Sequence, residues 1–314
     1  MARFRVVVSD QVFPSLDVER EILAGIDAEL LVADGTADGL VQIGAEADGI
    51  LNTYLPIDAP LIARLPGCRI VARYGIGVDN IDVAAAAKAG IVVTNVPDYS
   101  VEEVAVHTLA LILAVLRRIP AADRKVRDGG WGLDGLRPIR RVSELSFGLV
   151  GFGRIGQKVA IGIEALGGRV AVYDPYLTAR PGLPAIVNLD ELVSTSDVIS
   201  IHAPLTPETR GLFDAVRIAS MPAGSLLVNT SRGGLVVLDA VLDALRDGHL
   251  AGAALDVFER EPVDAGRISG VPNLLVTPHM AYYSEQSIAE SQRKAATQVT
   301  KVLTGEPPDY PIKP

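Results

Sequence analysis

Gly151-Phe152-Gly153-Arg154-Ile155-Gly156 is the stretch of sequence that decides the fold. It follows the apolar pair Leu149-Val150 and precedes a helical pattern from Gln157 to Leu166. Glycines at this spacing allow a tight turn, a close approach of the backbone to a pyrophosphate, and close packing of the helix on the strand. The N-terminus of the helix adds unpaired N–H groups and a positive dipole. The stretch therefore predicts a Rossmann-type dinucleotide site.

The charge at the end of the next predicted strand indicates which dinucleotide binds. Asp174 stands 18 positions after Gly156. Its carboxylate can accept hydrogen bonds from the ribose hydroxyls of adenosine and would repel a 2′-phosphate, so NAD is predicted rather than NADP. Arg180 is the nearest basic residue that would weaken this prediction. The alternative is that Asp174 is only the polar end of a strand.

Short apolar runs alternate with helical patterns along the whole chain. This alternation predicts an α/β fold with two doubly wound parallel sheets. A turn at Pro97-Asp98-Tyr99-Ser100 separates two series of strands near Ser100. The predicted strands are Phe4–Ser9, Ala28–Val32, Gly49–Asn52, Arg69–Arg73 and Ile91–Thr94 in the first series, and Ser146–Val150, Arg169–Tyr173, Val198–Ile201, Ser225–Val228, Gly252–Asp256 and Leu274–Val276 in the second.

The composition of the 314 residues limits the classes of partner. Hydrophobic residues make up 49% and charged residues 21%, which fits a large buried core. The net charge of −9 argues against nucleic acid as a partner, because a nucleic-acid groove needs a basic face. Cys68 is the single cysteine, so no intrachain disulfide can form and a reducing compartment is expected.

The apolar segments do not predict a membrane protein. The first residues indicate a strand and not a signal peptide, and the run from Val104 to Leu116 is too short to span a bilayer. We therefore expect a cytoplasmic protein with no membrane partner, and no metal site is predicted.

Three segments far apart in the chain carry the polar groups that a hydride-transfer site needs. An arginine holds a carboxylate at two points, a histidine passes a proton, and a carboxylate orients that histidine and favours its protonated form. Without a ligand, the arginine would be a surface residue of a glycine-rich turn and the carboxylate a solvated charge. The segments are Asn229-Thr230-Ser231-Arg232-Gly233-Gly234 with Arg232, Phe258-Glu259-Arg260-Glu261-Pro262 with Glu261 and its competitor Glu259, and Thr277-Pro278-His279 with His279.

The chain has four histidines, and their positions favour one of them as the acid–base group. His279 follows a strand at the point where the chain leaves the sheet, which places it among the ligand-binding loops. His107 lies in the middle of a helix among apolar residues and is interpreted as a core histidine. His249 stands at a helix end and is expected to be solvated. His202 follows a buried strand and is expected to be a structural or cofactor-wall residue.

The order and composition of these motifs resemble the D-isomer-specific 2-hydroxyacid dehydrogenase family over nearly the whole chain. The resemblance implies a flavodoxin-like substrate domain, discontinuous over residues 1–100 and 284–314, and a Rossmann NAD-binding domain over residues 101–283. It also implies reversible reduction of a 2-oxo acid to a (D)-2-hydroxy acid. In that reaction Arg232 anchors the substrate, and His279, tuned by Glu261, exchanges the proton. The sequence does not say which acid is the substrate.

The resemblance also implies which loops surround the ligands. The segment Arg73-Tyr74-Gly75-Ile76 resembles the substrate loop of the family, with backbone N–H groups of Gly75 and Ile76 near the substrate carboxylate. The implied cofactor contacts are Gly151, Gly153, Arg154, Ile155, Gly156, Asp174, His202, Ala203, Pro204, Thr230, Ser231 and Asp256, of which Asp256 would lie near the nicotinamide carboxamide.

Several details resemble the subgroup of the C-terminal-binding proteins more than the phosphoglycerate dehydrogenases, among them Ala281-Tyr282-Tyr283-Ser284. Tyr282 replaces the tryptophan of that subgroup, which leaves the size of the pocket open. The usual acidic pair after Arg232 is absent, and Asp239 is expected to cap the next helix instead. The alternative function that this resemblance implies is an NAD(H)-sensing scaffold for a protein partner.

A homodimer is expected from one apolar helix and the segment after it. The helix predicted from Val101 to about Arg118 is apolar almost all round and would be buried on several sides. The segment from Arg117 to Arg141 is predicted to be an irregular connection or arm, and its Trp131 could contact a partner subunit. The alternative is that the helix is buried wholly within one chain.

Overall fold

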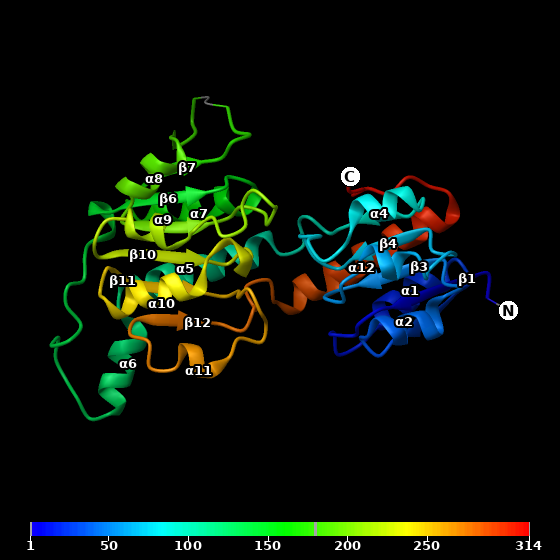
Figure 1. The fold of residues 1–314 in the computed structure, drawn as a ribbon, viewed down its shortest axis with the longest axis horizontal. Helices are drawn as coiled ribbons and strands as arrows, with labels where there is room; N and C mark the ends of the chain where they lie inside the picture. The colour runs from blue at the N-terminus through cyan, green and yellow to red at the C-terminus, as the bar shows by residue number, and fades with distance from the viewer. Residues whose placement is uncertain (1, 179–180, 314) are drawn as a thin grey trace. The chain divides into compact units, whose positions relative to one another are not determined.

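The computed structural model describes residues 2–178 and 181–313, and it divides into two compact units (Figure 1). Unit 1 contains the residues up to Ser100 together with those from Ser284 onward, and unit 2 contains Val101–Tyr283. Arg180, which bears on the choice of cofactor, lies outside the described residues.

Unit 1 is built on a five-stranded parallel sheet in the order β2-β1-β3-β4-β5. This order is that of the flavodoxin-like folds. β3 and β4 are buried along their whole length, as expected of central parallel strands that are covered on both faces. The strands are β1 Phe4–Val8, β2 Ala28–Val32, β3 Gly49–Asn52, β4 Ile70–Arg73 and β5 Val92–Thr94, and the helices are α1 Asp17–Ala24, α2 Ala37–Gly44, α3 Ala59–Ile62, α4 Val83–Lys88 and α12 Glu285–Thr304.

The last helix, α12, returns to unit 1 and packs against α1, β3 and β4. Ser284 caps its N-terminus in a reciprocal arrangement with Ser287, and Gly305 ends it in the left-handed region with a φ of 88°. Its inward face carries small residues such as Ala295 and Ala296, which are fully buried and let the helix approach the sheet closely.

Unit 2 is built on a seven-stranded parallel sheet in the order β12-β11-β10-β9-β6-β7-β8. Counted from β6, this is the Rossmann order, and the strand order reverses between β6 and β9. Ligands bind at such a reversal, outside the carboxyl ends of the strands. The strands are β6 Ser146–Val150, β7 Arg169–Tyr173, β8 Ala185–Ile186, β9 Val198–Ile201, β10 Ser225–Asn229, β11 Leu250–Leu255 and β12 Leu274–Val276.

The helices of unit 2 cover both faces of this sheet. α5 packs against α7, β10 and β11, whereas α10 packs against β11 and α9. They comprise α5 Val101–Leu116, α6 Ile119–Arg127, η1 Val142–Glu144, α7 Arg154–Ala165, α8 Leu189–Thr195, α9 Ala215–Ala219, η2 Gly233–Leu235, α10 Leu238–Arg246 and α11 Ala265–Ile268.

The predicted α/β class with two doubly wound sheets is confirmed, and two local predictions are wrong. Asp239 does not cap α10, because the N-cap residue is Val237 and makes no side-chain cap; Asp239 instead binds Arg267 at 2.6 Å. The segment from Arg117 to Arg141 is not wholly irregular, since it contains α6. The two-residue strand β8 was not predicted, because it is too short to show a periodic pattern.

α5 is buried on one face and leaves a second apolar stripe incompletely covered. Val101, Val104, Leu111 and Ile112 are buried in the core of unit 2. Val106, Leu109, Ala110 and Leu113, spaced as one face of the helix, remain partly or fully exposed. On the neighbouring α7, Ile161 is also exposed, and so is Leu166 directly after the helix.

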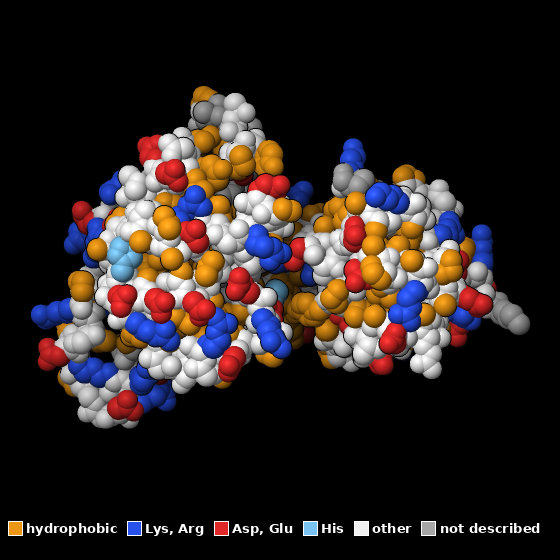
Figure 2. Space-filling model, in the orientation of Figure 1, with side chains coloured by type: hydrophobic (Ala, Val, Ile, Leu, Met, Phe, Trp, Pro, Cys, Tyr) orange, Lys and Arg blue, Asp and Glu red, His pale blue; other side chains and the backbone are white. Residues whose placement is uncertain are grey.

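In the described part of the chain, no single helix has the length and apolar character needed to cross a membrane. α5 and α6 satisfy that test only together, across a bend of 59°. On the face of the molecule shown in Figure 2, basic and acidic side chains are interspersed over both units.

Candidate functional site

The glycine loop between β6 and α7 contains two glycines that the protein's own packing requires, Gly151 and Gly156. The third, Gly153, borders open space. Gly151 has a φ of +94°, and a Cβ there would lie 2.7 Å from the carbonyl carbon of His202. A Cβ on Gly156 would lie 2.6 Å from the carbonyl oxygen of Gly151. A Cβ on Gly153 would meet no atom within 4 Å, so the structure leaves room beside this backbone. Gly153 is the N-cap of α7 and offers no side-chain cap, which leaves the first N–H groups of Arg154 and Ile155 to a ligand.

Asp174 lies beside this loop at the end of β7. Its carboxylate accepts the N–H of Phe152 at 2.9 Å and the N–H of Tyr176 at 3.0 Å. These two bonds fix the side chain next to the glycine turn, where an adenosine ribose would approach. The residues present therefore fit a dinucleotide: a bare backbone and helix N-terminus for the phosphates, and a carboxylate for the ribose.

His202 follows β9 directly across the strand-order reversal from Gly151. Its Nε2 lies 2.9 Å from the hydroxyl oxygen of Ser200, and its Nδ1 is buried without a hydrogen-bond partner among the described residues. Burial lowers the pKa of His202 to about 4. Burial therefore favours the neutral form of this imidazole, and Ala203 and Pro204 follow it in the same loop.

The hydroxyls of Thr230 and Ser231 point into the unit and stabilise the loop after β10. Thr230 Oγ1 lies 2.8 Å from Thr108 Oγ1, and Ser231 Oγ donates to the carbonyl of Ile201 at 2.7 Å. These two bonds tie the loop after β10 to α5 and to β9.

Arg232 lies in the same loop, directly before the short helix η2. Its carbonyl accepts from Asn229 Nδ2 at 2.9 Å. A Cβ on Gly233 would lie only 1.8 Å from the carbonyl carbon of Phe258, so glycine is needed for the Arg232 loop to touch the loop that carries Glu261. The contact brings two segments together that are separated in the sequence.

Glu261 and His279 form a hydrogen-bonded pair. His279 Nδ1 lies 2.6 Å from Glu261 Oε2, and Glu261 Oε1 accepts the N–H of Phe258 at 2.9 Å. Burial by itself would raise the pKa of Glu261, but the bond to His279, the N–H of Phe258 and the charge of Arg232 together hold it below its ordinary value. An ionised Glu261 can only accept, so Nδ1 of His279 carries the proton of this hydrogen bond. The competitor Glu259 makes no such contact with His279 among the hydrogen bonds of the described residues.

Asp256, which the resemblance places near the nicotinamide carboxamide, follows β11 and contacts the turn that carries His279. Its carboxylate is fully buried and accepts from Thr277 Oγ1 at 2.5 Å, Met280 N at 2.9 Å and Ala281 N at 3.0 Å. The side chain is therefore engaged by the turn that carries His279. The sequence shows an acid at a strand end, but it does not show which donors surround that acid.

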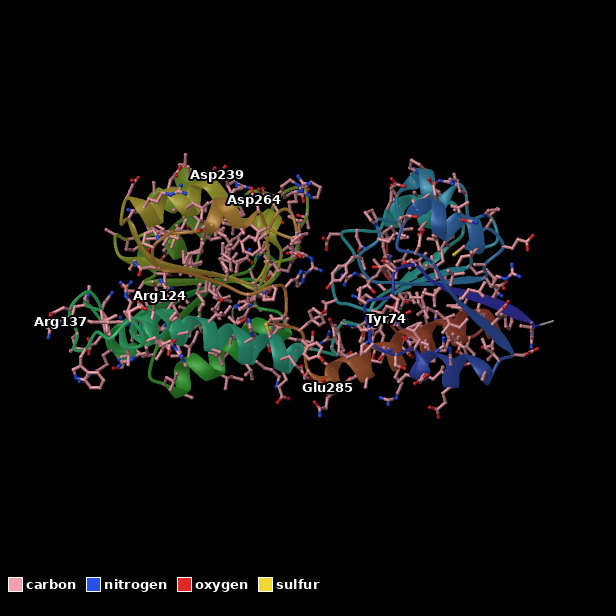
Figure 3. All side chains as sticks on the ribbon, turned by 90° about the horizontal axis from the view of Figure 1, so that it is seen from below. Tyr74, Arg124, Arg137, Asp239, Asp264 and Glu285 are labelled. Atoms are coloured by element: carbon pink, nitrogen blue, oxygen red, sulfur yellow. The ribbon has the colours of Figure 1, made fainter. Side chains whose placement is uncertain are left out.

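In unit 1, Tyr74 lies directly after β4 (Figure 3). Its side chain is buried, stacks edge-on against Phe13 and donates to Glu19 Oε1 at 2.8 Å. The backbone of Tyr74 is bonded as well, since its N–H donates to the carbonyl of Asn52 at 2.9 Å and its carbonyl accepts from Ser291 Oγ. Gly75 and Ile76 follow in a loop whose carbonyls accept from Val96 N and Asn95 Nδ2.

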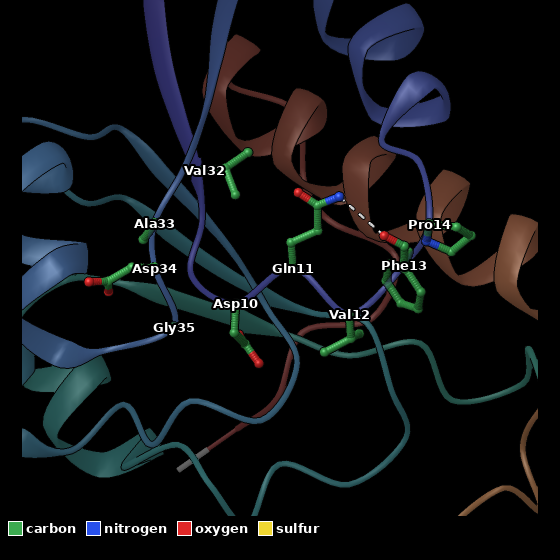
Figure 4. Close-up of a pocket in the computed structure, with 9 residues that line it drawn as sticks. All are labelled: Asp10, Gln11, Val12, Phe13, Pro14, Val32, Ala33, Asp34 and Gly35. Atoms are coloured by element: carbon green, nitrogen blue, oxygen red, sulfur yellow. Dashed lines mark hydrogen bonds between the residues drawn. The ribbon is translucent and has the colours of Figure 1, made fainter.

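Unit 1 also contains a pocket of about 540 Å³ at the carboxyl ends of β1 and β2 (Figure 4). Two acids, Asp10 and Asp34, line it. Asp10 accepts the N–H groups of Thr53, Tyr54 and Leu55, and Asp34 accepts that of Thr36. Because Asp10 holds the loop after β3 and Asp34 holds its own turn, both carboxylates are engaged by the backbone, and the pocket does not present a built ligand site.

The sequence of unit 2 places this geometry in a known family. Residues 109–281 match the NAD binding domain of the D-isomer specific 2-hydroxyacid dehydrogenases. The chain belongs to this family. The predicted family and the predicted NAD-binding domain are thereby confirmed.

Curated relatives extend the match over most of the chain. The D-3-phosphoglycerate dehydrogenase of Mycobacterium tuberculosis (strain ATCC 25618 / H37Rv) is 38% identical over 311 residues, which cover 96% of this chain and 57% of that protein. The D-3-phosphoglycerate dehydrogenase of Bacillus subtilis (strain 168) is 36% identical over 304 residues, covering 95% and 56%. The chain thus spans little more than half the length of these relatives. Their names give no support to the predicted nearness to the C-terminal-binding proteins.

Solved structures match both units. The D-lactate dehydrogenase from Aquifex aeolicus, complexed with NAD and lactic acid, has a TM-score of 0.86 at 30% identity, covering 96% of each chain. The NADPH-dependent glyoxylate/hydroxypyruvate reductase from Sinorhizobium meliloti, in complex with NADP and malonate, has a TM-score of 0.88 at 30% identity, covering 99% of this chain and 97% of that one.

Proposed function

We propose that this chain is an NAD-dependent oxidoreductase that interconverts a 2-oxo acid and a (D)-2-hydroxy acid. The observation that carries the proposal is the meeting of three loops in unit 2. The contact of Gly233 with Phe258 and the bond between Glu261 and His279 assemble an arginine, a carboxylate and a histidine at the carboxyl ends of neighbouring strands. A cation that binds a carboxylate and a proton donor beside a dinucleotide site are the groups that this reaction requires.

The proposed roles follow from the chemistry of each group. The guanidinium of Arg232 holds the substrate carboxylate and orients the 2-oxo group, because its planar fork of donors matches two carboxylate oxygens. In the reductive direction, His279 gives the proton on Nε2 to the carbonyl oxygen. Glu261 keeps Nδ1 protonated and stabilises the imidazolium before the transfer. When bound, the nicotinamide supplies the hydride that goes to the carbonyl carbon.

We also propose that NAD is preferred over NADP. Asp174 is held beside the glycine turn by two backbone N–H groups, so its charge is fixed where a 2′-phosphate would have to lie. Similar folds bind NAD in the Aquifex aeolicus dehydrogenase and NADP in the Sinorhizobium meliloti reductase, so the charge at this position is the proposed determinant.

A homodimer and a cytoplasmic location are further parts of the proposal. The stripe of Val106, Leu109, Ala110 and Leu113 on α5, together with Ile161 on α7, offers an apolar face that a second subunit would cover. The arm that follows α6 carries Trp131, whose side chain is 85% exposed. Cys68 is buried and unpaired, as in proteins of a reducing compartment.

The proposal is tested by mixing the protein with NADH and a panel of small 2-oxo acids, including glyoxylate, hydroxypyruvate, pyruvate and aryl pyruvates, and following the loss of NADH absorbance. We expect steady turnover with at least one acid. His279→Ala should lose about 100-fold or more of that rate and still bind NADH. His249→Ala is the matched control, because His249 lies at the other end of β11, where it contacts the carbonyl of Ile218.

Binding of NADH without turnover of any acid would contradict the proposal. That outcome would favour the alternative of an NAD(H)-sensing scaffold.

A further inference from the structure

The turn that carries His279 adopts a backbone conformation that needs external support. His279 has a φ of +52°, in the left-handed region that residues with a side chain rarely adopt. Its N–H donates to the carbonyl of Asp256 at 2.8 Å. The carboxylate of Asp256 receives the next two N–H groups, those of Met280 and Ala281. Asp256 therefore determines the path of the backbone through His279.

The hydrogen bonds around Asp256 fix the direction of a third donor. An ionised carboxylate only accepts, so the hydroxyl proton of Thr277 must point to Asp256 Oδ1, 2.5 Å away. The oxygen of Thr277 is then left to accept. His107 Nε2 lies 3.2 Å from this oxygen and 3.7 Å from Asp256 Oδ1. Both neighbours are acceptors, so Nε2 of His107 carries a proton.

Thr108, which follows His107 in α5, supports the loop that carries Arg232. Thr108 Oγ1 donates to the carbonyl of Val104 at 2.7 Å, so the hydrogen bond of 2.8 Å between Thr108 and Thr230 is donated by Thr230. Thr230 stands two residues before Arg232. Two consecutive residues of α5 thus contact the two loops on which the proposed chemistry depends.

We propose that His107 is a positioning residue, which acts through Thr277 and Asp256 to keep His279 in its left-handed turn and its ring on Glu261. The proposal rests on the oxidoreductase function proposed above. His107 donates to Thr277, Thr277 donates to Asp256, and Asp256 holds the backbone after His279. Loss of the N–H of His107 leaves the Thr277 hydroxyl free to rotate away from Asp256. The turn that carries His279 then becomes looser.

The test compares two substitutions of His107 by kinetics and by amide hydrogen exchange. Leu fills a similar volume without a donor, whereas the amide of Gln places an N–H near the position of Nε2. We expect His107→Leu to lower kcat about 10- to 100-fold with little change in the KM for NADH, because small misplacements of a reacting group have effects of that order. The amides of Met280 and Ala281 should exchange about 10-fold faster. His107→Gln should restore both.

Thr277→Val breaks the same chain of bonds from the other side and should reproduce the kinetic effect even if His107→Leu does not fold. The pair His249→Leu and His249→Gln is the matched control and should change neither kcat nor the exchange of Met280 and Ala281. Unchanged kcat and exchange in His107→Leu, in an active wild-type protein, would overturn the positioning role alone. Absence of turnover in the wild type would overturn the proposed function, and the exchange measurement would still decide whether His107 holds the turn.

Discussion

Acidification should destabilise unit 2 through His202. The ordinary pKa of 6.5 falls to about 4 in the folded protein, and the cause is burial of the ring. A depressed histidine pKa means that the unfolded chain binds the proton more tightly than the folded one. The stabilising effect of the neutral ring is therefore complete above pH 6.5 and is lost as the pH falls to about 4. The shift of the His202 pKa corresponds to a loss of about 3 kcal/mol in the free energy of unfolding at pH 4, since one pKa unit is about 1.4 kcal/mol.

The ring signals of the histidines in an NMR titration measure this directly. The chain has four histidines, and His202→Gln assigns one signal by its disappearance. The midpoint for His202 should lie near 4. Ser200→Ala removes the hydrogen bond to Nε2 but leaves the ring buried, so the midpoint should remain low. Urea denaturation of the wild type and of His202→Gln, followed by circular dichroism at pH 7 and pH 4.5, gives the linked change in stability.

Between pH 7 and pH 4.5, the free energy of unfolding should fall less in His202→Gln than in the wild type. A midpoint near the ordinary pKa of 6.5, or equal acid sensitivity of the two proteins, would refute the reasoning. Either result would mean that the loop after β9 opens to water, and His202 could then not be a permanent wall of the cofactor site.

Three further predictions concern the cofactor, the proton and the core of unit 1. Asp174→Ala should narrow the preference for NADH over NADPH, measured as the ratio of the two kcat/KM values. Equal use of both cofactors by the wild type would contradict the role proposed for Asp174. Glu261→Gln keeps the shape but removes the charged acceptor that lies 2.6 Å from His279 Nδ1, so the rate of reduction at pH 7 should fall; an unchanged rate would mean that Glu261 does not act on His279. Burial raises the pKa of Glu19, so the stability that its protonated form gives to unit 1 is present below the ordinary value of 4.5 and is lost as the pH rises through the raised value. Glu19→Gln should therefore flatten the dependence of thermal unfolding on pH above 4.5, and an unchanged slope would show that Glu19 is hydrated.

The sequence by itself determined the fold class, the glycine turn and the identity of the family. These features depend on short-range pattern: apolar runs that match single strands, and glycines at positions such as Gly151 where the backbone φ is positive. Arg232, Glu261 and His279 could be singled out because each follows a strand in a recognisable motif. The pairing of Glu261 with His279 was predicted from the resemblance and is present in the structure at 2.6 Å.

Only the tertiary structure decided what surrounds each polar group. Tyr74 and Asp256 stand at strand ends like the other predicted site residues, yet the structure buries the first against Glu19 and the second under the turn of His279. His107 was interpreted as a core histidine, and its contact with Thr277 spans 170 positions of sequence. The physical reason is that local periodicity fixes which side of a helix or strand is buried, whereas a hydrogen bond between distant segments depends on how those elements pack.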